Sequence, residues 1–141
     1  MAHDYDKWFE RCVGSWESHR RYLYGSNLAI DNLVTSFSIK KSDTNKFNLS
    51  WSSDRNTGEM NFHLVDDECR RDIGYYTSEP TTSKMTMIDD DTIVFTTSYG
   101  GIDYREEIRL LHGDDMRLRQ TVGFKNGVLN VVGQYFEQRL T

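Results

Sequence analysis

The chain has 141 residues, a length typical of one domain. Hydrophobic residues make up 37% and charged residues 28% of the composition, the mean hydropathy is −0.69, and no apolar run approaches the roughly 20 residues of a membrane-spanning helix. The net charge of −5 argues against a nucleic-acid-binding protein, whose surface would be basic. The acidic N-terminus lacks the basic and apolar regions of a signal peptide, so we expect one cytoplasmic domain over residues 1–141 with neither membrane nor nucleic acid as partner.

The residues that most often carry catalysis or bind metals are sparse. Cys12 and Cys69 are isolated, and no histidine lies at metal-ligand spacing from either, so we expect free thiols and no metal site. The motifs GxSxG, HExxH, Walker A and GxGxxG do not occur. The run of aspartates at 89–91 lacks the alternating ligands of a calcium loop, and we interpret it as a solvent-exposed turn.

A single helix is predicted near the N-terminus, over residues 4–13. From Tyr5 to Val13 the apolar residues recur at i, i+3, i+4, i+7 and i+8, which forms one apolar stripe. Asp4 is suited to cap the start of this helix, and Gly14 is expected at the position just beyond its end.

After Gly14 the hydrophobic pattern alternates, which indicates β-strands. We predict strands over residues 15–24, 33–40, 46–52, 59–65, 69–77, 83–88, 92–99, 102–111, 116–124 and 128–140. Asn126-Gly127 between two alternating segments predicts a tight hairpin. Short connections join antiparallel neighbours, and so many strands must protect their edges. The strands therefore close into a barrel or fold into a sandwich, and we favour an all-β, antiparallel up-and-down barrel of about ten strands, which the N-terminal helix flanks or plugs.

Charged residues fall on regular faces of several predicted strands. Arg117 and Arg119 share one side of their strand, and Tyr135 and Glu137 share one side of the last strand. A solvent-exposed face is favoured in general, because Arg and Glu are rarely buried without a partner. Large aromatic residues on the same faces suit instead a pocket for a flat ligand with polar edges. The pattern alone leaves both interpretations open.

Three segments resemble one known family. Residues 9–20, with Gly-x-Trp-x-Ser-x-Arg over 14–20, resemble the helix-to-strand opening of the S-type phycobiliprotein lyases, the CpcS/CpeS chromophore lyase family. Residues 106–109 and 116–122 resemble the family's Glu-Arg segment and its Leu-Arg-Leu-Arg-x-Ser strand. Residues 135–139 resemble its terminal Ser-Glu-Ile-Arg. The motifs follow the family's order over nearly the whole chain.

The resemblance implies a ten-stranded, lipocalin-like barrel that binds an open-chain tetrapyrrole, phycocyanobilin or phycoerythrobilin. Members of the family deliver this bilin to a cysteine of a phycobiliprotein subunit and form a thioether. The bilin would be a substrate rather than a permanent cofactor, and the acceptor subunit would be the protein partner. The resemblance also leaves open a homodimer, or a heterodimer with a related lyase subunit, in the cyanobacterial cytoplasm or a plastid stroma.

The same resemblance assigns roles to individual residues. The bilin-binding residues it implies are Arg20, Trp51, Arg117, Arg119 and Thr121. The catalytic residues it implies are Glu107 and Glu137, whose carboxylates can accept hydrogen bonds from pyrrole N–H groups. Guanidinium groups suit the propionates of a bilin, and an indole can stack on its rings. The reacting thiol belongs to the acceptor, so neither cysteine of this chain needs a catalytic role.

The chain departs from the family pattern at several positions. Residues 21–24 replace a Thr/Ser-His pair that is common after the first-strand arginine, Thr121 replaces serine, and Gln138 stands where isoleucine is usual. Two alternatives to a lyase therefore remain. One is a non-catalytic carrier of a hydrophobic small molecule, and the other is a supporting subunit of a heteromeric lyase.

Overall fold

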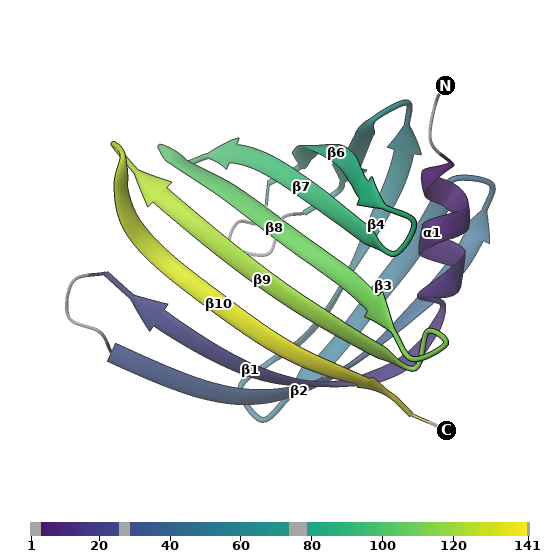
Figure 1. The fold of residues 1–141 in the computed structure, drawn as a ribbon, viewed down its shortest axis with the longest axis horizontal. Coiled ribbons are helices and arrows are strands. Elements are labelled where there is room, and N and C mark those ends of the chain that lie inside the picture. Colours follow the sequence, from purple (N-terminus) through teal and green to yellow (C-terminus); the bar gives the residue numbers. More distant parts are fainter. Residues whose placement is uncertain (1–3, 26–28, 74–78, 141) are drawn as a thin grey trace.

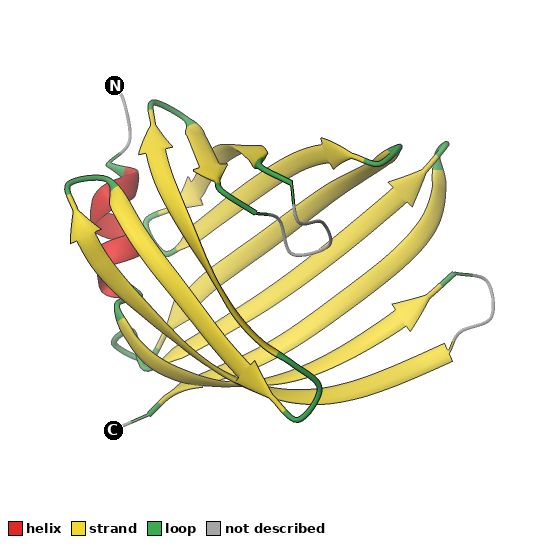
Figure 2. Cartoon of the chain, turned by 180° about the vertical axis from the view of Figure 1, so that it is seen from behind, coloured by secondary structure: helices red, strands yellow, loops and turns green. Residues whose placement is uncertain are grey.

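The alternating segments close into a barrel. The structure, a computed structural model, describes residues 4–25, 29–73 and 79–140. One helix, α1 (Tyr5–Arg11), precedes ten strands. The strands are β1 (Gly14–Tyr24), β2 (Ala29–Asp43), β3 (Lys46–Ser53), β4 (Thr57–Val65), β5 (Glu68–Arg71), β6 (Thr81–Asp89), β7 (Thr92–Tyr99), β8 (Ile102–Leu111), β9 (Met116–Lys125) and β10 (Val128–Arg139). Each strand pairs antiparallel with its sequence neighbours, and β1 pairs with β10 to complete the barrel (Figures 1 and 2). The predicted all-β, up-and-down, lipocalin-like architecture is confirmed.

The largest differences from the predicted elements concern their ends. The strand expected over 69–77 is shorter, because β5 ends at Arg71, and residues 74–78 lie outside the described part of the chain. The helix ends at Arg11 with Cys12 as its C-cap, so the prediction that Gly14 directly follows it is wrong. Gly14 instead begins β1 with φ of 136°, and a Cβ there would lie 2.5 Å from Nη1 of Arg139. The glycine is thus needed for backbone conformation and space rather than for ending the helix.

The hairpin between β9 and β10 has the predicted turn. Asn126 and Gly127 both have positive φ, 51° and 75°, as a tight hairpin with the right-handed twist of its strands requires. Asp4 also caps α1 as predicted, since its side chain accepts a hydrogen bond from the Lys7 amide.

Helix α1 closes one end of the barrel. It lies at that end in both ribbon views, and its buried residues belong to the main apolar core (Figures 1 and 2). The ring of Phe9 lies 5.5 Å from that of Phe47, 5.1 Å from that of Phe62 and 6.0 Å from that of Phe95. This packing fills the half of the barrel next to α1 with hydrophobic side chains.

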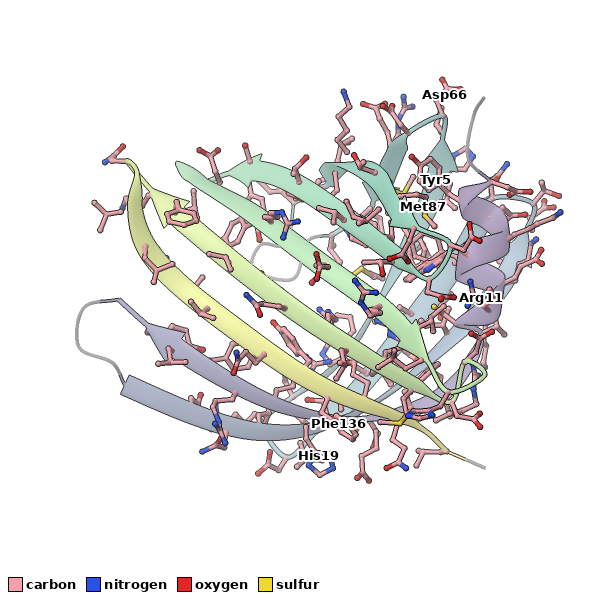
Figure 3. The ribbon with its side chains drawn as sticks, viewed as in Figure 1. Tyr5, Arg11, His19, Asp66, Met87 and Phe136 are labelled. Carbon is pink, nitrogen blue, oxygen red and sulfur yellow. The ribbon has the colours of Figure 1, made fainter. Side chains whose placement is uncertain are left out.

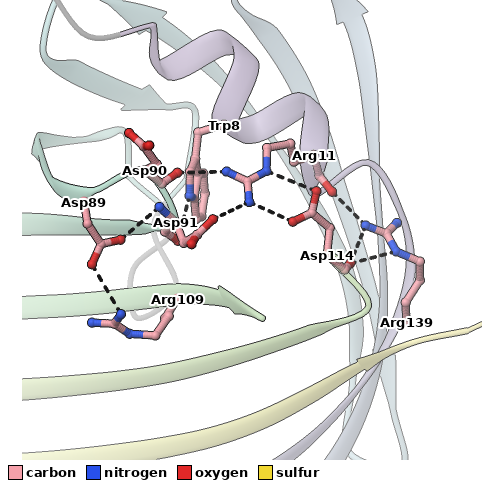
Figure 4. Close-up of polar contacts among 8 residues, drawn as sticks. All are labelled: Trp8, Arg11, Asp89, Asp90, Asp91, Arg109, Asp114 and Arg139. Atoms are coloured by element: carbon pink, nitrogen blue, oxygen red, sulfur yellow. Dashed lines mark hydrogen bonds and ion pairs between the residues drawn. The ribbon is translucent and has the colours of Figure 1, made fainter. Parts of the chain in front are cut away.

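Polar contacts hold α1 to two turns of the barrel (Figure 4). Arg11 Nη2 lies 2.6 Å from Asp91 Oδ1 and 2.8 Å from Asp114 Oδ1. The indole Nε1 of Trp8 donates to the carbonyl of Asp91 over 3.1 Å. Nε and Nη2 of Arg139, on β10, donate to the carbonyl of Asp114. The aspartate run at 89–91 is therefore more than the solvent-exposed turn we predicted, because it anchors the helix.

None of the helical residues in the described part of the chain forms a helix that is long and apolar enough to cross a membrane.

Candidate functional site: a cavity in the half of the barrel away from α1

The barrel encloses a cavity of about 180 Å³ in the half away from α1. Its wall includes Tyr22 near the end of β1 and Ser53 at the end of β3, both far along their strands from the helix. The apolar and aromatic residues of the wall are Tyr22, Leu33, Phe37, Leu49, Trp51 and Tyr135. The polar residues of the wall are Arg20, Thr35, Ser53, Asn56, Glu106 and Arg119. A wall on which aromatic and apolar side chains surround converging polar groups is typical of a small-molecule site.

Strand alternation brings these side chains inward. On β1 and β10 the outward residues His19 and Phe136 are register partners, and Figure 3 shows both projecting from the barrel. Their sequence neighbours, such as Arg20 and Tyr135, therefore point into the barrel. For these two strands and for β9, the charged faces do look inward, as the family resemblance implied.

An ion-pair network of four buried side chains runs along the inner face of β8, β9 and β10. Arg117 Nε donates to Glu137 Oε1 over 3.0 Å, and Arg119 Nη1 lies 3.5 Å from Glu137 Oε2. Arg119 also donates to Glu106 Oε2 from Nε over 3.1 Å and from Nη2 over 2.9 Å. The hydroxyl of Thr121 donates to the same Glu106 oxygen over 3.1 Å. The buried charges thus compensate one another, as burial requires.

Aromatic rings complete the surroundings of the two network arginines. The guanidinium of Arg117 lies 5.5 Å from the ring centroid of Trp16 and 5.4 Å from that of Phe37. The guanidinium of Arg119 lies 4.2 Å from the ring of Tyr135, a cation–π distance. Both arginines are therefore held by ion pairs and rings of the protein itself.

Both carboxylates of the network are ionised at neutral pH. Burial alone would raise the pKa of Glu106, but the guanidinium groups of Arg119 and Arg71 outweigh burial and hold it below its usual value. Burial opposes ionisation of Glu137 in the same way, and Arg117 and Arg119 again lower its pKa overall. Glu106 therefore presents an acceptor-only carboxylate on the cavity wall.

Arg20 differs from the other arginine of the cavity wall. Its Nε donates to the hydroxyl of Ser18 over 3.0 Å, and its guanidinium lies 5.3 Å from the ring of Tyr135. Within the described parts of the chain, no carboxylate lies within ion-pair distance of Arg20, whereas Arg119 is paired with two. Arg20 is thus the cation of this wall that can receive an anionic group from a ligand.

Trp51 forms an aromatic wall of the cavity because its neighbour has no side chain. Trp51 and Gly58 are register partners on β3 and β4. A Cβ on Gly58 would lie 2.4 Å from Cζ2 of the indole, so only glycine lets the ring lie across the neighbouring strand. The indole is partly buried against the core, and it offers a flat surface to a conjugated ligand.

The structure separates the predicted site residues into groups. Arg20, Trp51 and Arg119 line the cavity. Thr121 and Glu137 are buried in the ion-pair network rather than on the cavity wall. Arg117 belongs to the same network and lines a smaller pocket, of about 30 Å³, toward the core around Phe9.

The predicted inward position of Glu107 is wrong. Its side chain is 38% exposed and lies 3.5 Å from Arg105 on the outer face of β8. There it lines an open groove of about 740 Å³ on the outside of the barrel. Strand alternation explains this placement, because Ile108 and Leu110 of β8 are buried in the core and Glu107 has the opposite parity.

Glu106 is the carboxylate that the sequence interpretation missed. It is buried and shares the inner face of β8 with Ile108 and Leu110. That shared parity with two apolar residues was the signal available in the sequence. It was overlooked because on the next strand, β9, the residues of the inner face are the charged ones, Arg117 and Arg119.

The two cysteines are free, as predicted, and both are buried. Burial raises the pKa of both the Cys12 and the Cys69 thiol. Neither side chain is therefore disposed to form a reactive thiolate.

These features define a lipocalin-like barrel with a charged and aromatic cavity at the end opposite its helix. The model of the CpeS-like protein family matches residues 67–140, which contain the whole ion-pair network. The chain belongs to this family.

Individual relatives agree with this assignment. The chain is 27% identical over 162 aligned positions to a Nostoc sp. (strain PCC 7120) protein provisionally named phycocyanobilin lyase CpcS 2, covering 95% of this chain and 89% of that protein. It is 34% identical over 83 positions to a Picosynechococcus sp. protein provisionally named chromophore lyase CpcV, covering 59% of this chain and 41% of that protein. The fold is similar to that of the S-type phycobiliprotein lyase CPES from Guillardia theta, with a TM-score of 0.75 at 20% identity, covering 100% of this chain and 94% of that one.

Proposed function

We propose that this protein is a bilin lyase. It binds an open-chain tetrapyrrole, phycocyanobilin or phycoerythrobilin, in the barrel cavity and attaches it by a thioether to a cysteine of a phycobiliprotein subunit. The lyase names of its relatives support this function. The observation that carries the proposal is that one cavity wall holds a cation without a carboxylate partner, Arg20, an ionised carboxylate, Glu106, and an indole, Trp51.

Each of these three groups matches one part of a bilin. A propionate can pair with the guanidinium of Arg20 through charge-assisted hydrogen bonds. The pyrrole N–H groups of a protonated bilin are donors, and Glu106 offers an acceptor that stabilises the positive charge. The indole of Trp51 offers a face on which the conjugated rings can stack.

The size of the cavity favours partial enclosure of the substrate. Its volume of about 180 Å³ lies below the roughly 300–1,000 Å³ of pockets that enclose a drug-sized ligand. A tetrapyrrole would therefore extend from the cavity through the end of the barrel opposite α1. This arrangement suits transfer to a macromolecule, because the reacting ring must stay accessible to a cysteine on another protein.

The chemistry requires a held and activated bilin rather than a nucleophile of the lyase. The acceptor's thiol adds to the exocyclic double bond of the first bilin ring. A C–S bond forms, the π bond breaks, and the thiol proton ends on the bilin. Glu106 keeps the pyrrole nitrogens protonated and so makes that carbon more electrophilic. Positioning and electrostatic stabilisation supply the acceleration.

A reconstituted transfer reaction tests this function. Purified protein is mixed with phycocyanobilin and an apo-phycobiliprotein subunit, and the denatured acceptor is examined for zinc-enhanced bilin fluorescence. We expect a red-shifted bilin complex first and a fluorescent acceptor band later, and no band with an acceptor that lacks its cysteine. Binding without transfer would indicate a carrier, and transfer only with a related lyase subunit present would indicate a supporting subunit. Absence of binding would refute the proposal.

The protein's own thiols should be dispensable. Because burial keeps both in the thiol form, we expect the double variant Cys12→Ala/Cys69→Ala to transfer bilin at a rate close to that of the wild type. The measurement is the initial rate of acceptor labelling, with circular dichroism to verify folding. Loss of transfer by a folded variant would reveal a covalent bilin–lyase intermediate and contradict the mechanism above.

A further inference from the structure

Thr35 has a buried hydroxyl that lacks a hydrogen-bond partner in the described part of the chain. Thr35 lies on β2, is 2% exposed and lines the cavity. Among the residues that the structure describes, none forms a hydrogen bond with its Oγ1. Burying a hydroxyl without a hydrogen bond costs free energy, so such groups are rare and call for an explanation. A ligand atom in the cavity would supply the missing partner.

The residue opposite Thr35 is already engaged. Ser18 is the register partner of Thr35 on β1 and is fully buried. Its hydroxyl accepts a hydrogen bond from Arg20 Nε. Ser18 is also the register partner of Glu137 on β10, and it helps to lower the pKa of that carboxyl. Although Ser18 and Thr35 face each other across the strands, the Thr35 hydroxyl forms no hydrogen bond with Ser18.

Arg20 and Thr35 lie on the same wall of the cavity. Arg20 is two residues beyond Ser18 on β1 and pairs with Leu33, two residues before Thr35 on β2. Arg20 and Thr35 are therefore diagonal neighbours on adjacent strands, a spacing that long side chains can bridge together with a small group. One offers a cation without a carboxylate partner and the other a free hydroxyl donor.

We propose that Arg20 and Thr35 form a subsite for one carboxylate of the ligand, with the Thr35 hydroxyl donating a hydrogen bond to the oxygen that Arg20 pairs with. This inference rests on the proposed function, and it assigns to Thr35 a role in substrate binding. The other arginine of the wall, Arg119, is already paired with Glu106 and Glu137. The subsite therefore holds one of the two propionates of a bilin, and the second propionate lies toward the mouth of the barrel.

Removing the hydroxyl should affect binding and stability in opposite directions. Thr35→Val keeps the shape and deletes only the unpartnered polar group. We expect its affinity for phycocyanobilin to fall about tenfold, while its melting temperature without ligand stays the same or rises. Thr35→Ser keeps the hydroxyl and should bind within about threefold of the wild type. Thr86→Val, the same change on an exposed position of β6, is the matched control and should leave both quantities unchanged.

The dimethyl ester of phycocyanobilin shows whether the hydroxyl acts on a carboxylate. The ester should bind the wild type more weakly than the free acid does, and Thr35→Val should weaken ester binding little further. Equal affinity of wild type and Thr35→Val for the free acid would overturn the subsite. An equal loss of affinity for the acid and the ester in Thr35→Val would also overturn it. The same holds for a fall in the melting temperature of Thr35→Val that is large enough to explain its weaker binding. If the wild type binds neither compound, the proposed function itself fails, whatever Thr35 does.

Discussion

Replacing Glu137 by glutamine should lower the free energy of unfolding by about 3–5 kcal/mol, because the change leaves two buried guanidinium groups without their shared counter-ion. Glu137 is fully buried and bridges Arg117 and Arg119. Glutamine preserves its shape and can still accept a hydrogen bond, but it carries no charge. The expected loss is a large part of the roughly 5–15 kcal/mol that stabilises a domain of this kind. Urea denaturation followed by tryptophan fluorescence measures it.

Glu107→Gln is the matched control for this experiment. It makes the same chemical change on the outer face of β8, in an exposed ion pair with Arg105. Exposed pairs contribute about 0–1 kcal/mol, so this variant should unfold near the wild-type urea midpoint. If the two variants had equal midpoints, the buried network would not be a stabilising unit, and the interpretation of Glu137 as a structural counter-ion would be wrong.

The pH dependence of stability gives a second readout of the same network. The pKa values of Glu106 and Glu137 lie below the 4.5 of an unperturbed glutamate, so as the pH falls the unfolded chain takes up protons before the folded protein does. The stability that these groups provide is therefore complete above about pH 4.5 and is lost as the pH falls toward their folded pKa values. Glu137→Gln removes part of this component, so its unfolding free energy should fall less steeply in acid than that of the wild type.

Arg20→Ala should weaken phycocyanobilin binding by more than tenfold and leave the fold intact. A charge-assisted hydrogen bond contributes about 1.5–3 kcal/mol, which corresponds to about 10- to 150-fold in affinity. The fold should survive because the polar contacts of Arg20 within the described residues are a hydrogen bond to the Ser18 hydroxyl and the ring of Tyr135. Its charge helps to lower the pKa of Glu137, but Arg117 and Arg119 contribute more and remain in the variant. Absorbance titration with phycocyanobilin measures the affinity, and thermal unfolding verifies the fold.

Arg21→Ala provides the comparison for Arg20→Ala. Arg21 is the next residue on β1 and is exposed on the outside of the barrel, so its removal changes the net charge equally without touching the cavity. Its affinity for phycocyanobilin should match that of the wild type. Equal affinities for both variants would mean that Arg20 does not contact the bilin and would remove the support that it gives to a carboxylate-binding cavity.

The two predictions separate stability from binding within one barrel. The arginines of β9 are neutralised by Glu106 and Glu137, so their removal would disturb the folded state before any effect on ligand could be measured. Among the residues that the structure describes, Arg20 has no carboxylate as ion-pair partner and the Thr35 hydroxyl has no hydrogen-bond partner. Recognition of a ligand carboxylate is therefore expected to come mainly from β1 and β2, and stability from the ion-pair network of β8, β9 and β10.

The sequence by itself determined the architecture of this protein. The change from helical to alternating periodicity after Gly14, the turn residues between segments and Asn126-Gly127 predicted an N-terminal helix and antiparallel strands that form a barrel or a sandwich, and the family resemblance favoured the barrel that the structure has. These features are local, because strand periodicity and turn conformation depend on residues close in the chain. The sequence also placed Arg20, Trp51 and Arg119 in one cavity, through the family resemblance.

Only the tertiary structure decided which charges are available to a ligand. Alternation divides each strand into two faces but does not by itself say which face looks inward. The parity of Glu106 with Ile108 and Leu110 favoured an inward Glu106, but the charged inner face of β9 shows that apolar parity is not a reliable guide in this barrel. Arg119 is 13 residues from Glu106 and 18 residues from Glu137 in the sequence. Their pairing therefore depends on the register of β9 with β8 and β10. That long-range register neutralises Arg117 and Arg119, whereas among the described residues Arg20 has no ion-pair partner and the Thr35 hydroxyl has no hydrogen-bond partner. No local pattern in the sequence distinguishes these two residues from the others.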